Sequence, residues 1–183
     1  LMEGSNEYVA KSGFHFNQST AHYYAQIEED DPKLFDAIRA KALSGGWEAV
    51  GGLWVEPDTN MPTGESLTRQ VLYGQLYFER TFGARHTVCW LPDCFGFSGG
   101  LPQLLKQGGI DSFFTIKVNW NETNTIPTDL FWWEGIDGSR VLAHTFNNPR
   151  GGYNGELGPE AYLATWKNFK DKHRHPQTLL AVG

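Results

Sequence analysis

The sequence predicts an α/β protein with a mostly parallel sheet. Three observations lead to this prediction. Short apolar segments of strand length alternate with segments of helical period along the chain. Two of the apolar segments, 87–91 and 112–118, are nearly unbroken, as in strands buried on both faces of a parallel sheet. Glycines follow the helical segments and separate them from the next strand. Such an alternation forms either an open sheet or a closed barrel.

Caps and apolar spacing predict the helices. Asp31-Pro32 is typical of a helix start, and Gly45-Gly46 then ends that helix. A second helix begins near Thr63 and closes at Gly83. Two more are predicted over 101–107 and 159–172. The residues predicted to face inward are Leu34, Phe35, Ile38 and Ala42 in the first helix, Leu67, Val71, Leu72 and Phe78 in the second, and Leu163, Trp166 and Phe169 in the last.

The extended segments lie between these helices. Two segments, 131–133 and 140–146, are joined around Asp137-Gly138 and predict a hairpin inserted into the strand–helix order. The glycine-rich segment 147–158 is predicted to be a loop. The other predicted extended segments are 47–55, 87–91, 112–118 and 178–182.

Composition excludes several classes of protein. The 183 residues carry a formal charge of −6 and are 14% aromatic, so the chain is too apolar to be disordered and too acidic to capture nucleic acid electrostatically. It has no run of about 18 apolar residues, which argues against a membrane span. The only cysteines, Cys89 and Cys94, fit no disulfide framework, and most of the seven Trp are expected in the core. A cytoplasmic protein is predicted.

Asp93 is the sharpest candidate for chemistry. It follows the predicted strand 87–91 in the string WLPDCFGFSGGLP, so its carboxylate is expected at the carboxyl end of the sheet, where α/β folds place their active sites. It could act as nucleophile, base or metal ligand. The alternative is a structural carboxylate that caps the next helix or braces the glycine-rich turn. Phe95 is expected to face the same cleft, and Lys117 could lower the pKa of Asp93 unless it is an ordinary surface lysine.

A second polar cluster lies in the string WVEPDTNMPTGESLTRQ. It places several carboxylates at or just beyond another strand end, and a polar cleft with aromatic rings suits carbohydrate. The alternative for Glu65 and Ser66 is that they stabilise the start of a helix. The cluster contains Glu56, Asp58, Asn60, Glu65, Ser66 and Arg69.

Histidine spacing does not define a metal site. No pair has the helical spacing of a motif such as HExxH, so each histidine is interpreted as structural or solvated. The histidines are His15, His22, His86, His144, His173 and His175.

Long strings in the chain resemble the class II α-mannosidases of glycoside hydrolase family 38, especially their cytosolic and microbial branch. The resemblance extends from FHFNQSTAHYY to TLLAVG. Its strongest parts are GGWEAVGGLWVEPDTNMPTGESLTRQ, WLPDCFGFSGGLPQLLKQGGID, KVNWNETN and FWWEGIDGSRVLAHTF. It implies an irregular seven-stranded α/β barrel with mostly parallel strands, of which this chain holds a part.

The resemblance also implies roles for individual residues. Asp93 matches the Asp of the DxFG string, which is both the nucleophile and a ligand of a catalytic zinc, with cobalt as another possible ion. Phe95 matches a ring that packs against the sugar, and Lys117 matches a basic residue bonded to the nucleophile. Tyr153 and Asn154 match a tyrosine and a carboxylate that bind the glycone, and Asn154 departs from the family there. With Glu56 and Asp58, these residues form the predicted substrate site.

Two parts of the family pattern are missing from the chain. Neither an HxHxD-type string nor the GD-containing string with the acid/base is found, so most metal ligands are expected outside the chain. We therefore expect residues 1–183 to be a fragment of the N-terminal catalytic domain that lacks the first and last strands, with the acid/base after Gly183. The fragment alone is expected to be inactive.

The predicted activity is retaining, metal-dependent hydrolysis of terminal α-D-mannosides in oligosaccharides, in an enzyme that could form a homo-oligomer. Two alternatives stay open. One is a metal-dependent carbohydrate deacetylase on a similar barrel, which would release acetate instead of sugar. The other is a sugar-binding relative without catalysis, which would bind mannose without turnover.

Overall fold

The computed structural model describes residues 15–145 and 155–182. In these residues, helices alternate with short strands, as the sequence predicts for an α/β protein. The helices are α2 (Ala21–Asp30), α3 (Pro32–Leu43), α4 (Gly64–Phe82), α5 (Leu101–Gln107) and α6 (Pro159–Asn168), and a 3-10 turn spans Lys117–Asn119. The strands are β1 (Phe16–Gln18), β2 (Trp47–Ala49), β3 (Val88–Trp90), β4 (Ser112–Thr115), β5 (Leu130–Glu134) and β6 (Arg140–Thr145).

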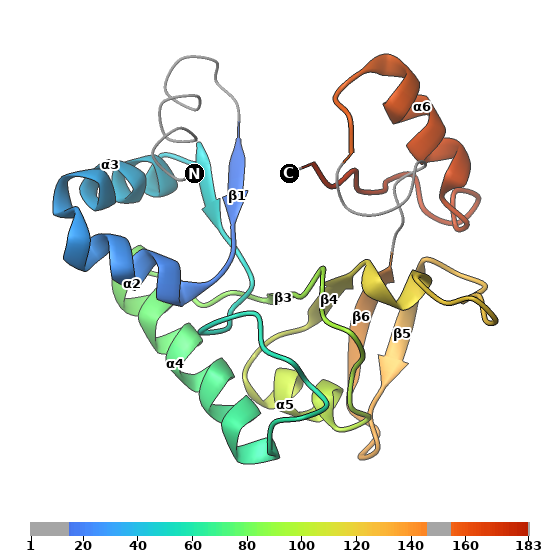
Figure 1. Cartoon of the computed structure of the whole chain (residues 1–183), viewed down its shortest axis with the longest axis horizontal. Helices are drawn as coiled ribbons and strands as arrows, with labels where there is room; N and C mark the ends of the chain where they lie inside the picture. Colours follow the sequence, from blue (N-terminus) through green and yellow to red (C-terminus); the bar gives the residue numbers. More distant parts are fainter. Residues whose placement is uncertain (1–14, 146–154, 183) are drawn as a thin grey trace.

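The strands form two sheets, and most neighbours are parallel (Figure 1). β1 pairs with β2, and the second sheet has the order β3-β4-β6-β5. β3, β4 and β6 are parallel, whereas β5 runs antiparallel to β6. The predicted hairpin is therefore confirmed, and its second strand continues the parallel sheet. The described residues thus have a mixed α/β fold.

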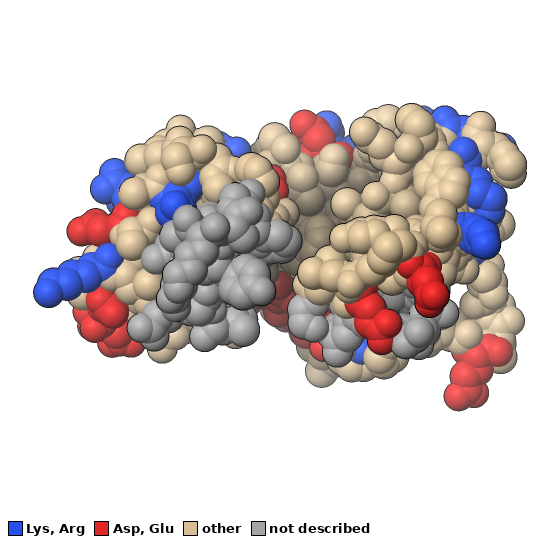
Figure 2. All heavy atoms as spheres, turned by 90° about the horizontal axis from the view of Figure 1, so that it is seen from above, with Lys and Arg blue, Asp and Glu red and all other residues tan. Residues whose placement is uncertain are grey.

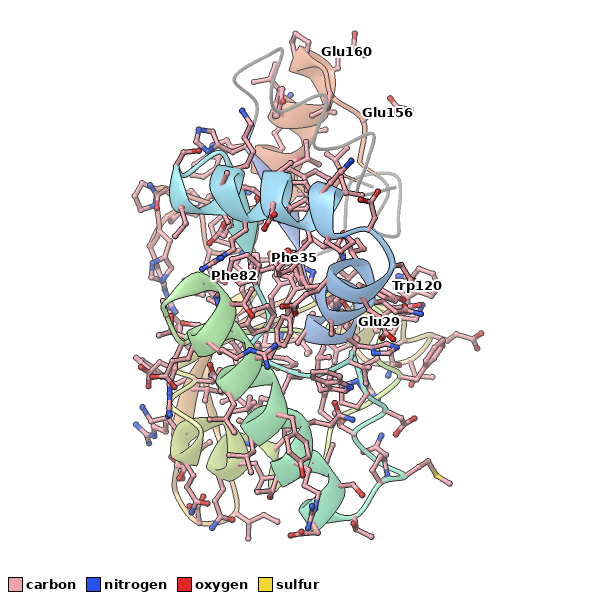
Figure 3. The ribbon with its side chains drawn as sticks, turned by 90° about the vertical axis from the view of Figure 1, so that its left-hand side faces the viewer. Glu29, Phe35, Phe82, Trp120, Glu156 and Glu160 are labelled. Carbon is pink, nitrogen blue, oxygen red and sulfur yellow. The ribbon has the colours of Figure 1, made fainter. Side chains whose placement is uncertain are left out.

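The two-stranded sheet lies beside a layer formed by α2, α3 and α4 (Figure 1). Their shared core contains Tyr24, Ile38, Trp47 and Phe78, all essentially inaccessible to solvent. Figure 3 shows Phe35 and Phe82 pointing into the space between α3 and α4. Aromatic rings supply much of the packing in this core, where part of the aromatic content of the chain is buried.

The helix ends follow the sequence signals. Asp31 accepts a hydrogen bond from the Leu34 amide at 3.0 Å, and Thr63 accepts one from the Ser66 amide at 3.2 Å. Each bond satisfies an amide that has no partner inside its helix. α4 ends at Gly83, whose φ of 78° is in the left-handed region that glycine adopts without strain. The first two predicted helices are confirmed.

α4 also approaches the segment after β2 at close range. A Cβ atom at Gly74 would lie 2.6 Å from the Gly52 carbonyl oxygen and would collide with the Leu53 backbone. Leu53 and Val71 then join Leu91, Leu105 and Phe113 in the second core, between α4, α5 and the four-stranded sheet. The absence of a side chain at position 74 therefore lets α4 support the segment that leads to Glu56.

The end of the described chain is attached to β5 by two carboxylates. Asp171 accepts hydrogen bonds from the amides of Asp129 and Leu130 at 2.6 and 2.9 Å. Asp129 accepts a bond from the Lys170 amide at 2.7 Å. Both carboxylates are buried. These bonds fix the segment after α6 against the start of β5.

Several predictions for this region are wrong. α6 ends at Asn168 instead of Lys172. Of the three residues predicted to face inward, Leu163 and Trp166 are exposed, and only Phe169, one residue beyond the helix, is buried. Residues 178–182 form no strand, although Gly155 donates an amide hydrogen bond to the Ala181 carbonyl. The predicted loop 147–158 falls mostly outside the described residues.

Elsewhere the differences are smaller. Leu72 is exposed on α4, unlike the other predicted inward residues Leu67, Val71 and Phe78. The predicted extended segments 47–55 and 112–118 pair as strands only over Trp47–Ala49 and Ser112–Thr115. β1 and α2 were not predicted. Of the Trp residues, only Trp47 is fully buried, and Trp120, Trp132 and Trp166 are exposed.

The surface is hollowed between the part formed by α2 and α3 and the part formed by α6, as Figure 2 shows from above. No helix in residues 15–145 or 155–182 is long and apolar enough to cross a bilayer.

Candidate active site

The site is built from residues that follow four strands, which form two parallel pairs, β1 with β2 and β3 with β4. Ser19 lies just after β1, Glu56 beyond β2, Asp93 after β3 and Lys117 after β4. Gly51 lies where the two sheets meet, because a Cβ atom there would be 3.4 Å from the Ser19 Cβ and 3.6 Å from the Trp90 Cβ. The carboxyl ends of β1 and β3 are therefore close together, as active sites of α/β folds require.

Asp93 and Lys117 form an ion pair across β3 and β4. The Asp93 side chain is 50% exposed, whereas the Lys117 side chain is only 6% exposed. Lys117 is thus not a surface lysine, and its charge favours the ionised form of Asp93. Asp93 does not cap α5, because the N-cap residue of that helix is Gly100 and no side chain caps it. Half of the Asp93 side chain is therefore exposed to solvent at the carboxyl end of β3.

Glu56 is held by Ser19. The Ser19 hydroxyl donates a hydrogen bond to Glu56 Oε1 at 2.5 Å. Desolvation raises the pKa of Glu56, the Ser19 hydrogen bond opposes this, and the negative charge of Asp93 raises the pKa further. The Glu56 side chain is exposed, and its carboxyl group lies near enough to Asp93 for the two negative charges to interact.

The backbone next to Ser19 has an unusual conformation. Thr20, which follows Ser19, has a φ of 74°, which is uncommon for a residue with a side chain.

The other residues of the second polar cluster make local contacts within the described part of the chain. Asp58 Oδ1 accepts hydrogen bonds from the amides of Asn60 and Met61 at 2.7 and 2.9 Å, and these bonds lower its pKa. Glu65 pairs with Arg69 on the surface of α4 at 2.7 Å. Ser66 lies in the first turn of α4 and donates its amide to Thr63. A direct role in binding stays a prediction for Asp58.

Two exposed rings flank Lys117. Its Nζ atom lies 4.5 Å from the centre of the Phe95 ring and 3.6 Å from the centre of the Trp120 ring. Phe95 is 79% exposed and Trp120 is 55% exposed. Phe95 was predicted from the sequence, but Trp120 and Ser19 were not. Ser19 follows β1 and Trp120 follows the 3-10 turn after β4, and neither position carries a local sequence signal.

Two predicted binding residues, Tyr153 and Asn154, lie outside the described residues. Within the described ranges, no three His, Cys, Asp or Glu side chains come together to hold a metal ion. Asp93 fits one position in a metal site because its carboxylate is exposed, and hard cations and zinc both accept carboxylate oxygen. The described residues therefore contain one candidate oxygen ligand and not a complete site.

The arrangement suits attack by a carboxylate on an electrophilic carbon beside a polar ring. Asp93 supplies the exposed anion, Lys117 pairs with it, and Phe95 offers an apolar face.

Comparison with known proteins assigns the chain to a family. A family model described as "Glycosyl hydrolases family 38 N-terminal domain" matches residues 5–183.

The chain belongs to this family. Curated relatives agree with the assignment. The family 38 chain is 42% identical over 170 residues to "Alpha-mannosidase G" of Dictyostelium discoideum, covering 93% of this chain and 16% of that protein. It is 40% identical over 183 residues to human "Alpha-mannosidase 2C1", covering all of this chain and 17% of that protein. The chain spans about a sixth of the length of these relatives.

Solved structures share the fold of the family 38 chain. An α-mannosidase from Enterococcus faecalis V583 matches with a TM-score of 0.74 and 20% identity, covering 91% of this chain and 19% of that chain. A putative polysaccharide deacetylase from Mycobacterium smegmatis matches with a TM-score of 0.56 and 10% identity, covering 87% of this chain and 49% of that chain. At these identities, both likenesses concern the fold alone.

Proposed function

We propose that this chain supplies the nucleophile of a retaining α-mannosidase that hydrolyses terminal α-D-mannosides of oligosaccharides. The main observation in support is the exposed Asp93 carboxylate, which the buried Lys117 ammonium holds at the end of β3. Family membership and the names of the relatives support mannose as the sugar. The deacetylase alternative is supported only by a shared fold at 10% identity.

In the proposed reaction, an Asp93 oxygen attacks C1 of the mannoside, and the bond from C1 to the leaving oxygen breaks. The leaving oxygen takes a proton from a separate carboxylic acid, which we place outside the described residues. Water then cleaves the ester between Asp93 and C1 and returns the proton to that acid. In retaining enzymes of this kind, the two carboxyl groups lie about 5–5.5 Å apart. Lys117 keeps Asp93 ionised for the attack.

We also propose that the enzyme binds zinc or cobalt, with Asp93 as one ligand and the other ligands outside the described residues. A bound divalent ion would polarise sugar hydroxyls and favour ring distortion towards the transition state. The exposed Asp93 carboxylate supports this assignment.

The remaining substrate contacts are assigned to Phe95, Glu56, Asp58, Tyr153 and Asn154. Phe95 supports a stacking role because most of its ring is open to solvent. The parallel order of β3, β4 and β6 and the proximity of β1 to β3 support an irregular seven-stranded barrel in the longer protein. The cytoplasmic location and a homo-oligomer stay predictions.

The nucleophile is tested with Asp93→Ala in the full-length enzyme. We expect turnover of an aryl α-mannoside to fall at least about 1000-fold, because the covalent step has no second route. Asp137→Asn is the control, since Asp137 is an exposed turn carboxylate bonded to Ser139 in the β5–β6 hairpin. It should leave the rate unchanged.

A second measurement identifies the ester directly. A fluorinated mannoside that is hydrolysed slowly should add one sugar mass to the peptide that contains Asp93. Near wild-type rates for Asp93→Ala, or a sugar attached to another residue, would contradict the assignment. Release of the β-anomer as the first product would contradict retention.

A further inference from the structure

Trp120 is not part of the substrate site described so far, yet it lies at its edge. The 3-10 turn Lys117–Asn119 follows β4, and the Trp120 amide bonds to the Lys117 carbonyl at 3.0 Å. The Ile116 amide bonds to the Pro92 carbonyl at 3.2 Å, which ties this turn to the residue before Asp93. The position of Trp120 is therefore fixed relative to the proposed nucleophile.

Hydrogen bonds within a turn also fix the residues that follow Trp120. Asn121 Oδ1 accepts hydrogen bonds from the amides of Thr123 and Asn124 at 2.9 and 2.8 Å. The turn is closed by the carbonyl oxygen of the Asn121 side chain, and the NH2 group of the same side chain takes no part in these two bonds. In Figure 3, Trp120 lies towards one edge of the molecule. A large ring is thus kept at the surface by backbone bonds on both sides.

Trp120 and Phe95 line one pocket of about 370 Å³, together with Gly96, Lys117, Val118 and Asn121. The Lys117 ammonium forms its floor, because it is buried and lies in contact range of both rings and of Asp93. The pocket therefore lies between two aromatic rings, and the ammonium that lines it is ion-paired with the proposed nucleophile Asp93.

We propose that Trp120 forms a second sugar subsite, which binds the residue next to the terminal mannose by stacking on its ring. This inference rests on the proposed function and deepens it. The pocket suits a carbohydrate, because sugar C–H faces pack on exposed rings while hydroxyls need polar neighbours such as the Asn121 amide. Lys117 contacts both Asp93 and Trp120, so the proposed subsite adjoins the proposed nucleophile through one shared side chain.

The test compares two substrates in the full-length enzyme. One is an α-linked mannose disaccharide, and the other is methyl α-D-mannoside, whose leaving group is too small to reach Trp120. The measured quantity is the ratio of kcat/KM for the disaccharide to kcat/KM for the methyl glycoside. Trp120→Ala should lower this ratio about fivefold, mainly through the KM of the disaccharide, as loss of one aromatic contact would. Trp120→Phe should restore most of it.

Trp132→Ala is the matched control, because Trp132 is also an exposed Trp, at 63%, but lies on β5. It should leave the ratio unchanged. Thermal unfolding checks that each variant folds, and Trp120→Leu replaces the alanine variant if that variant unfolds.

Three results would overturn the inference. An unchanged ratio in Trp120→Ala shows that the ring binds no second sugar. An equal loss with both substrates shows that Trp120 acts only by shielding Lys117. If the wild-type enzyme hydrolyses neither substrate, the proposed function itself fails before any variant is compared, and the subsite falls with it.

Discussion

Lys117 shows how a buried charge is compensated in this site. Removing an ammonium group from water is unfavourable unless other groups replace the lost hydration. Asp93 supplies the opposite charge, and the Phe95 and Trp120 rings direct their negative faces at the ammonium. Substitution of Lys117 would therefore affect the charge of Asp93 as well as local packing.

His86 illustrates the opposite case, in which a buried group stays neutral. Desolvation lowers the pKa of His86 to about 4, and its ring packs edge-on against Phe78 with ring centres 4.3 Å apart. Within the described residues, Nε2 has no hydrogen-bond partner. The main chain of His86 is held separately, by two hydrogen bonds to the Gln75 side chain.

We expect His86 to make the enzyme sensitive to acid. The unfolded chain takes up a proton near pH 6.5 and the folded chain only near pH 4, so stability is lost as the pH falls through this window. The loss is at most about 3 kcal/mol. In thermal unfolding of the full-length enzyme, His86→Phe should reduce the drop in Tm between pH 7 and pH 4.

His173→Gln provides the comparison, because it removes an exposed histidine. This variant should show the same acid-induced drop in Tm as the wild type. A drop in His86→Phe as large as in the wild type would refute the role of His86.

At the scale of single residues, strand-end positions were enough to find Asp93 and Lys117. Their ion pair follows from two parallel neighbouring strands. Ser19 and Trp120 were missed for a physical reason. β1 is only three residues long and shows no apolar pattern, and nothing in the sequence reveals whether a Trp is buried.

At the scale of elements, the close approach of α4 to residues 52–53 gives a direct prediction. Gly74→Ala places a Cβ against the Gly52 carbonyl and the Leu53 backbone, neither of which can rotate away. We expect a loss of about 2 kcal/mol. Because the displaced segment leads to Glu56, kcat/KM for an aryl α-mannoside should also fall. Thermal unfolding and steady-state kinetics of the full-length enzyme measure both effects.

Gly64→Ala is the control on the same helix, since no other atom lies within 4 Å of a Cβ built there. It should leave Tm unchanged or slightly raised. Equal Tm values for Gly74→Ala and Gly64→Ala would show that the packing of α4 tolerates the extra carbon.

The sequence predicted elements well where local chemistry determines them. α3, α4 and α5 have their expected starts and ends because caps, proline and glycine act within one turn. The last helix begins at Pro159 as predicted, but its inward face was predicted wrongly because its apolar residues Leu163 and Trp166 are not covered by any described segment. The segment 178–182 has a strand-like composition, but pairing depends on a neighbouring strand and not on composition.

At the scale of the whole molecule, the parallel order of strands was predicted, but the division into two sheets was not. Hydrogen bonding joins β1 only to β2, while β3 continues into the larger sheet. Long-range register of this kind depends on contacts far apart in the chain, which no local pattern contains. The same holds for the proposed metal site, because we place all of its ligands except Asp93 outside the described residues.

We expect chelation to inactivate the full-length enzyme. Removal of the ion should abolish hydrolysis of an aryl α-mannoside, and zinc or cobalt should restore it. Elemental analysis gives a second readout, since Asp93→Asn should lower the bound metal by weakening one ligand. Full turnover in a preparation free of bound metal would contradict the proposal.

The burial of Lys117 has a practical consequence for covalent labelling. Acylating reagents modify accessible, neutral amines, so the exposed Lys33 and Lys106 should react long before Lys117 in the native enzyme. Peptide mass spectrometry over a time course follows each lysine, and denaturation should make Lys117 as reactive as the others. Equal rates in the native state would show that this amine is open to reagent. Slow acylation of Lys117 would let surface lysines be coupled to a solid support while the proposed catalytic centre is spared.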